Sequence, residues 1–304
     1  MSELIQRGRR QDFDRATTAA VVSLQEALAR LRTTDGGWGY YPGKASRIES
    51  TCWGLLALAG SGKTAADLGP LTQWPREGPW LTDVAGAPIN YAFQALASLA
   101  LLSHPGGVDA ATSLAVALLD VRGARFDQSA AIRQDNSLQA WPWIADTFSW
   151  VEPTCLALIA VKKMRKRLPG TAAGRIDIGE RMLLDRVCGG GGWNYGGSNV
   201  YGQELYPYVP TTAWGLIALQ DRRTDPTVTR SVERLVADLE TERSAPALSL
   251  GSLALRTHGR PSAVAARALA AEAPRAIAFG NVLGQAMCLY ALTATTHGDS
   301  TFTL

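Results

Sequence analysis

A loop rich in glycine, tryptophan and tyrosine recurs along this chain of 304 residues, and a helix-forming segment of leucine and alanine follows each copy. The first copy, Asp35–Ala59, reads DGGWGYYPGKASRIESTCWGLLALA. A later copy, Gly189–Gln220, reads GGGGWNYGGSNVYGQELYPYVPTTAWGLIALQ, and a weaker one lies between them at Trp141–Val161. Self-similarity of this kind predicts a fold made of repeated supersecondary units.

Each copy also contains a start signal for a helix. Thr51, Thr154 and Thr211 occupy matching positions, and each is preceded by serine or proline. A hydroxyl can cap a helix N-terminus, and proline is tolerated in the first turn. The glycines permit tight turns, while each tryptophan can fill the gap between neighbouring helical hairpins.

The spacing of apolar residues predicts helix along nearly the whole chain, and no alternation of apolar and polar residues indicates a sheet. We expect about twelve helices, at residues 14–32, 51–59, 65–74, 91–102, 109–121, 154–166, 174–187, 212–219, 227–239, 248–255, 262–271 and 282–294.

Two kinds of helix alternate. Segments such as CWGLLALA are uncharged, whereas SVERLVADLETER carries charges on one face. A helix that is apolar all round is buried, and an amphipathic one lies outside. The sequence therefore predicts an all-α protein, an (α/α)6 toroid of about six helical hairpins with Gly-Gly-Trp loops. We expect residues 1–304 to form a single domain, with the first ten or so residues as a flexible arm.

The composition excludes several classes of protein. Thirty basic and 27 acidic side chains give a net charge of +3, and this near-balance does not favour nucleic-acid binding, because nucleic-acid-binding domains usually have a concentrated basic surface. Four cysteines are too few for a disulfide scaffold. No apolar run approaches the roughly 20 residues of a membrane-spanning helix, and the polar N-terminus does not look like a signal peptide. We expect a cytoplasmic protein.

The Gly-Gly-Trp loops and the apolar helices after them resemble the repeats of squalene–hopene cyclases and of protein prenyltransferase β-subunits. The resemblance implies a toroid with a central apolar cavity, and a terpene cyclase-like isomerase or lyase acting on an isoprenoid or another hydrophobic small molecule. The acid motif of those cyclases, Asp-x-Asp-Asp, has its nearest match in residues Asp12, Phe13, Asp14 and Arg15. That match lacks the last acid.

Two glutamates are the strongest candidates for the acid. Glu49 and Glu152 both stand two residues before a matching threonine, which places them at the same end of the toroid. Burial and mutual proximity would separate their pKa values and leave one carboxyl protonated as a general acid. The alternative is that each caps its helix and meets the positive end of the helix dipole. Asp146, followed by Thr147, is a third candidate, with a turn or cap as its alternative.

Aromatic residues gather on the same segments. In a cyclase their faces would stabilise a cationic intermediate, and the alternatives are a general apolar pocket or packing between repeats. The substrate-binding candidates are Trp53, Trp141, Trp143, Phe148, Trp150, Tyr206, Tyr208 and Trp214. Arg47, together with Lys44, is placed to meet an anionic group at the mouth of the cavity.

Other functions stay open at this stage. A toroid without catalysis could carry a lipid, an isoprenoid or a protein partner, and a metal-dependent prenyl transferase is a further alternative. We expect no bound metal or cofactor, because the chain has only three histidines. The basic run at residues 162–167 leaves contact with a membrane surface open, although its alternative is a solvated helix end.

Overall fold

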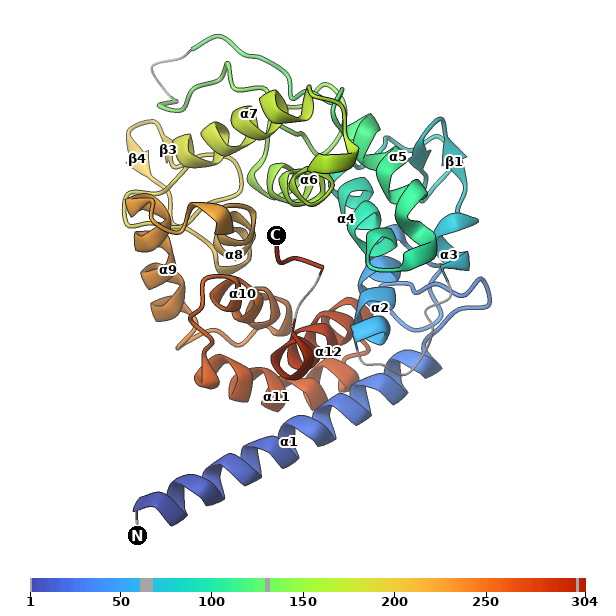
Figure 1. Ribbon diagram of the computed structural model, residues 1–304, viewed down its shortest axis with the longest axis vertical. Helices are drawn as coiled ribbons and strands as arrows, with labels where there is room; N and C mark the ends of the chain where they lie inside the picture. The colour runs from blue at the N-terminus through green and yellow to red at the C-terminus, as the bar shows by residue number, and fades with distance from the viewer. Residues whose placement is uncertain (1, 61–67, 129–131, 299–300) are drawn as a thin grey trace.

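The computed structural model describes residues 2–60, 68–128, 132–298 and 301–304, and it places helices in two concentric rings (Figure 1). The inner ring consists of α2 (Ile48–Gly60), α4 (Tyr91–Leu102), α6 (Val151–Lys163), α8 (Val209–Ala218), α10 (Ala245–Thr257) and α12 (Val282–His297). The outer helices are α1 (Ser2–Arg30), α3 (Gly69–Thr72), α5 (Val108–Leu118), α7 (Ala172–Asp185), α9 (Pro226–Asp238) and α11 (Ala263–Ala278).

The inner ring is closed. Each inner helix packs against the next one, and α12 returns to pack against α2. The inner helices are nearly uncharged and bury most of their residues, whereas an outer helix such as α9 buries one face only. Because an outer helix returns the chain after each inner one, the six inner helices run in the same direction. The predicted all-α (α/α)6 toroid is confirmed.

The tryptophans of the repeated loops join neighbouring hairpins. Trp38, Trp141 and Trp193 are fully buried. Their indole Nε1 groups donate hydrogen bonds to the preceding outer helices, at the carbonyl oxygens of Leu28, Leu118 and Leu183, over 2.9, 2.8 and 2.7 Å. A buried indole N–H needs such a partner, so each tryptophan fixes one hairpin to the start of the next.

The structure corrects the alignment of the third repeat by one residue. The backbone N–H of Trp193 donates to the hydroxyl of Thr212 at 3.1 Å, as that of Trp38 does to Thr51 at 3.0 Å. Thr211, the predicted match, instead donates to the carbonyl of Trp193, which is the role that Ser50 has in the first copy. The position that matches Glu49 and Glu152 is therefore Pro210, and it carries no carboxyl group.

Four inner helices begin three residues earlier than predicted: α2, α6, α8 and α10. Their first turns read IES, VEP, VPT and APA, and the prediction left these residues out because they interrupt the apolar run. Proline and acidic residues suit a first helical turn, where backbone N–H groups have no helical partner and the dipole is positive. Glu49 and Glu152 thus lie inside their helices rather than before them.

Two short hairpins were not predicted. Strand β1 (Arg76–Glu77) pairs with β2 (Trp80–Leu81), and β3 (Asn199–Val200) pairs with β4 (Gln203–Glu204), both antiparallel. Strands of two residues are too short to show an alternating pattern. The helix expected at 65–74 is represented by α3, and its part before residue 68 lies outside the described residues.

The end of the chain fills the centre of the toroid (Figure 1). The ring of Phe302 is fully buried, with centroids 5.5, 5.5 and 5.6 Å from those of Trp53, Trp214 and Tyr290. The Gln220 side chain holds the segment, since its Nε2 donates to the carbonyl of Phe302 at 2.7 Å and its Oε1 accepts from Leu304 N–H at 3.0 Å. The expected apolar cavity is filled by aromatic rings at this level.

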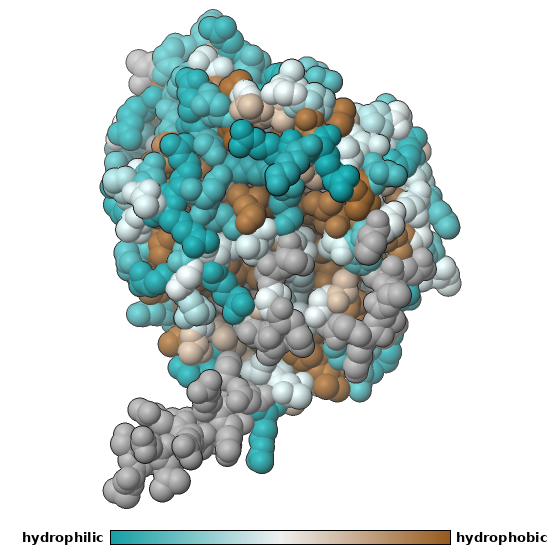
Figure 2. Space-filling view, in the orientation of Figure 1, coloured by the Kyte–Doolittle hydropathy of each residue, from teal (hydrophilic) through white to brown (hydrophobic). Residues whose placement is uncertain are grey.

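On the face drawn in Figure 2, apolar side chains form separate groups among hydrophilic ones. In the described part of the chain, none of the helices combines the length and apolar character that crossing a membrane requires. Helix α1 begins at Ser2. The single domain and the flexible arm stay predictions.

Candidate functional site

Two carboxyl groups lie at one end of the inner ring. Glu49 is in the first turn of α2 and Glu152 in the first turn of α6. The opposite end, where the inner helices finish, is occupied by the terminal segment that Gln220 and Lys163 hold. The two glutamates lie at the same end of the ring, where α2 and α6 begin, and their contact with a ligand stays a prediction.

Of the two carboxyl groups, that of Glu152 has the larger shift in pKa. Burial raises its pKa to about 7, and the charge of Glu49 adds to the effect. A helix N-terminus favours the ionised form, so desolvation outweighs the dipole here. No hydrogen bond or ion pair of the Glu152 carboxyl occurs within the described residues, so no side-chain or backbone partner offsets the desolvation of its charged form. Around pH 7 a substantial fraction of this carboxyl holds a proton.

Glu49 has a different environment. The Tyr40 hydroxyl donates a hydrogen bond of 2.6 Å to Glu49 Oε2, which stabilises the carboxylate. Burial and the nearby charge of Asp83 act in the opposite direction, and the net pKa of Glu49 is raised. Burial and the Glu49 carboxylate in turn raise the pKa of Tyr40, so this phenol remains a proton donor.

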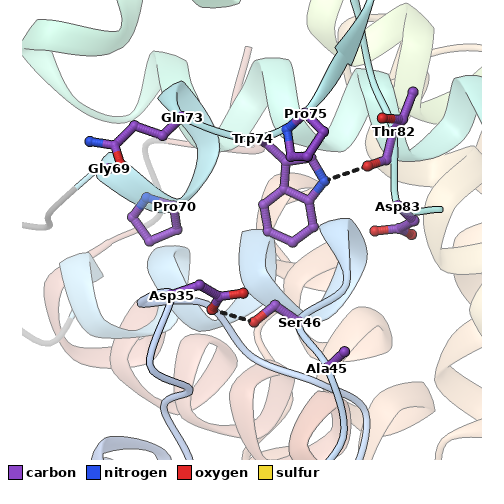
Figure 3. A pocket seen from close by; sticks show the side chains of 10 residues that line it. All are labelled: Asp35, Ala45, Ser46, Gly69, Pro70, Gln73, Trp74, Pro75, Thr82 and Asp83. Carbon is purple, nitrogen blue, oxygen red and sulfur yellow. Dashed lines mark hydrogen bonds between the residues drawn. The ribbon is translucent and has the colours of Figure 1, made fainter. Parts of the chain in front are cut away.

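Asp83, whose charge acts on both Glu49 and Tyr40, lines a side cavity of about 380 Å³ (Figure 3). Its Oδ1 accepts the backbone N–H of Ile48 at 2.7 Å and so caps α2 from outside the helix. Burial raises the Asp83 pKa, although Arg47 opposes this. Across the cavity from Trp74, the Asp35 carboxylate accepts a hydrogen bond of 2.6 Å from Ser46 (Figure 3).

A second cavity, of about 660 Å³, lies beside Tyr40, the hydrogen-bond partner of Glu49. Its wall includes Tyr40, whose hydroxyl bonds Glu49, as well as Lys44, Arg47 and the start of α12. Arg47 lies close enough to Tyr40 and Asp83 for its charge to oppose the rise of their pKa values, without reversing it. The predicted position of Arg47 beside the acids agrees with this placement, while its contact with a substrate stays a prediction.

A pair of tyrosines lies near Glu152, and further aromatic side chains come from the same loops. The rings of Tyr195 and Tyr208 lie 5.2 Å apart, and the charge of Glu152 adds to burial in raising the Tyr195 pKa. Tyr206 is 79% exposed. Trp150, the residue before α6, stacks on Phe148 at 4.3 Å.

The other predicted residues are placed elsewhere. Trp53 and Trp214 contact Phe302 in the filled centre, and Trp141 is a buried hairpin-joining residue like Trp38 and Trp193. Trp143 makes an edge contact with Phe93, with centroids 6.4 Å apart.

Asp146 is exposed and has a φ of 62°. The left-handed conformation is one that aspartate tolerates in turns, which agrees with the alternative of a turn residue. Among the described residues, no group of three or more His, Cys, Asp or Glu side chains is arranged to hold a metal ion.

Sequence reasoning missed Tyr40, Asp83 and Tyr195. A signal for the two tyrosines exists, because an aromatic residue follows two positions after the buried tryptophan in every copy. The carbonyls of Tyr40, Trp143 and Tyr195 each accept the first N–H of an inner helix, from Val282, Tyr91 and Val151 at 3.1, 2.8 and 2.8 Å. Asp83 had no signal, since its contact with α2 spans 35 residues of sequence.

No known protein-family profile matches this sequence, and no curated protein resembles it at a significant level. A solved structure does: the GH76 alpha-mannanase of Bacteroides thetaiotaomicron, determined as a selenomethionine derivative. The match covers 92% of this chain and 95% of that one, with a TM-score of 0.61 and 9% sequence identity. At this identity the likeness shows the (α/α)6 fold alone.

This comparison overturns the expected family. The similar solved structure is a glycoside hydrolase, so the predicted membership in the terpene cyclase and prenyltransferase superfamily is wrong, as is the isoprenoid-cyclising or isomerising function. The comparison does not support the alternatives of a lipid-carrying toroid and of a prenyl transferase either. A physical reason accompanies the correction: Trp53, Trp214, Tyr290 and Phe302 occupy the space in which a hydrophobic substrate was expected. Gly-Trp loops followed by apolar helices describe hairpin packing, which different enzymes share.

Proposed function

We propose that this protein is a glycoside hydrolase that cleaves an α-mannan-type polysaccharide at the end of the toroid where Glu49 and Glu152 lie. The observation that carries the proposal is the pair of carboxyl groups with unequal environments. Glycoside hydrolysis commonly requires one carboxylic acid that donates a proton and one carboxylate that acts on the anomeric centre or on water. The similarity to an alpha-mannanase fold supports the choice of substrate.

Glu152 is the proposed general acid. Its pKa of about 7 keeps a proton available in the pH range in which most enzymes work. The proton passes to the glycosidic oxygen as the bond from that oxygen to the anomeric carbon breaks. The leaving sugar departs as an alcohol, and no charge accumulates on its oxygen.

Glu49 is the proposed carboxylate partner. The Tyr40 hydroxyl favours its ionised form and fixes its orientation. The carboxylate either attacks the anomeric carbon or takes a proton from the attacking water. In both cases water supplies the hydroxyl group of the new reducing end.

The surroundings of the pair suit a carbohydrate. Tyr195, Tyr206 and Tyr208 are exposed and combine an apolar face with a hydroxyl group. The cavity beside Tyr40 offers further side chains for a second sugar unit. Sugar rings present apolar C–H faces and polar edges, which such mixed surfaces match.

The test is hydrolysis of yeast α-mannan, followed by the release of reducing ends. Glu152→Gln and Glu49→Gln preserve size and remove the ionisable group, and we expect each to lower kcat by about 10²- to 10⁴-fold. Glu77→Gln, on the exposed strand β1, is the matched control and should leave the rate unchanged. Absence of hydrolysis by the parent protein, or full activity of both variants, would refute the proposal.

A further inference from the structure

A basic, aromatic groove extends from the Tyr40 cavity across the start of α12. The 660 Å³ cavity beside Tyr40 and a neighbouring one of about 560 Å³ share Tyr41 and Asn281 in their walls, so the two lie side by side and we describe them together as one groove. The second cavity adds the start of α10, at Arg243, and the end of α11, at Arg275. One end of the groove is thus next to Glu49 through the Tyr40 hydroxyl.

The charge of the groove is one-sided. Its lining includes one carboxylate, Glu272, and four cationic side chains. The cations are Lys44, Arg47, Arg243 and Arg275. Glu272 lies 3.7 Å from Arg275, so it neutralises that end only in part. Within the described residues, Lys44 and Arg47 form no ion pair. The rest of the chain carries nearly balanced charge, which makes this concentration local.

The remaining lining residues suit a sugar rather than a flat macromolecular surface. Tyr41 and Phe279 are 54% and 68% exposed and present aromatic faces to the groove. Asn281 uses Oδ1 to accept the N–H of Gly284 at 3.0 Å, which leaves its Nδ2 donors with no partner in the part of the chain that the structure describes. Aromatic faces with a few amide and cationic donors in a concave site are typical of small-ligand recognition.

We propose that this groove binds an anionic substituent of the polysaccharide, a phosphate or a carboxylate on a sugar a few units from the cleaved bond. This inference rests on the proposed function, and it narrows the substrate class from α-mannan to acid-bearing glycans. The cations raise the local concentration of an anionic chain and orient it toward Glu49.

The test uses two arms. Binding is measured by calorimetry with the Glu152→Gln variant, and hydrolysis with the parent protein, on neutral yeast α-mannan, phosphomannan and oligogalacturonate. We expect phosphomannan or oligogalacturonate to bind about tenfold more tightly than neutral mannan at low salt, and the difference to shrink at high salt. Which of the two acids binds better distinguishes phosphate from carboxylate recognition.

The variant Lys44→Gln/Arg243→Gln/Arg275→Gln should remove most of this preference. The matched control Lys166→Gln/Arg167→Gln removes exposed charge at the opposite end of the inner ring and should retain it. Equal binding of neutral and acidic glycans, or equally tight binding of duplex DNA, overturns the inference. If the acidic glycans bind but no glycan is hydrolysed, the proposed glycoside hydrolase function is refuted, while the binding of anionic substituents in the groove is still supported.

Discussion

The Tyr40 hydroxyl lies 2.6 Å from Glu49 Oε2 and donates a hydrogen bond to it. Tyr40 belongs to the Gly-Trp loop of the first repeat, and Glu49 to the helix that this loop precedes. The repeat therefore does more than pack hairpins, because its second aromatic residue reaches the carboxyl group at the mouth of the ring. Glu152, in the matching position of α6, has no such partner among the described residues, and this difference separates the two glutamates chemically.

The first prediction concerns Tyr40→Phe. The hydrogen bond holds the Glu49 pKa down against burial and Asp83, so its removal should raise that pKa. If Glu49 acts as a carboxylate, the acid limb of the pH profile of kcat/KM moves to higher pH while the alkaline limb, which reports Glu152, moves much less. A profile of unchanged shape with a uniformly lower rate would contradict this role. Tyr201→Phe, which removes the hydroxyl of an exposed tyrosine in the turn between β3 and β4, is the control.

The second prediction concerns stability and pH. The folded pKa of Glu152, about 7, exceeds its ordinary value of 4.5, so the folded state binds this proton more tightly than the unfolded state does. The stabilisation that this proton gives the folded state is complete below pH 4.5, and it is lost as the pH rises from 4.5 through 7. Above pH 7 the buried charge costs about 3 kcal/mol.

Glu152→Gln should therefore match the parent protein at pH 4 and exceed its free energy of unfolding at pH 8 by up to about 3 kcal/mol. Urea unfolding at the two pH values measures this, with Glu77→Gln as the exposed control. A parent and variant that differ equally at both pH values would show that the effect is not protonation of Glu152.

Much of the fold was predictable because the packing of each hairpin determines the pattern of apolar and charged residues within its own helices. Uncharged and amphipathic helices alternate in the sequence, and α4 was predicted with its observed bounds. The buried tryptophans and their threonine partners follow from the repeat, apart from the one-residue shift between Thr211 and Thr212. That shift arises because both residues carry a hydroxyl, and only the backbone geometry shows which one receives the N–H of Trp193.

The site was less predictable, because its decisive contacts join distant segments. Glu49 and Glu152 were found as repeated acids, but Asp83 reaches α2 from a loop that belongs to no repeat. The filled centre depends on Phe302, which follows the last inner helix and has no counterpart in the repeats. The apolar helices alone could not show whether the ring encloses a cavity or packed side chains.

The third prediction tests the contact between loop tryptophans and inner helices. A Cβ atom at Gly54 would lie 2.7 Å from the ring of Trp38, and one at Gly215 would lie 2.6 Å from that of Trp193. Because both indoles are fully buried and hydrogen-bonded, neither can move away easily. Gly54→Ala and Gly215→Ala should each destabilise the fold by about 1–3 kcal/mol in urea unfolding.

Gly174→Ala is the control for this pair. Gly174 is also helical, in α7, but a Cβ atom there would meet nothing within 4 Å. Alanine should stabilise this helix by about 0.5–1 kcal/mol through its helix propensity. The opposite signs separate steric overlap from the general effect of replacing glycine, and a stabilised Gly54→Ala would contradict the packing described here.

The last prediction concerns the aromatic centre. Phe302→Ala would leave Trp53, Trp214 and Tyr290 facing a cavity, and large-to-small changes at buried aromatic positions cost about 3–5 kcal/mol. Phe279→Ala, at a ring that is 68% exposed, should change stability by less than about 0.5 kcal/mol. Thermal and urea unfolding of both variants measure the contrast. Phe302 contacts the middle of the inner ring, whereas Glu49 and Glu152 lie at the end where the inner helices begin. The pH profile of glycan hydrolysis by folded Phe302→Ala should therefore match that of the parent protein. A loss of only about 0.5 kcal/mol for Phe302→Ala would mean that the terminal segment is not part of the core.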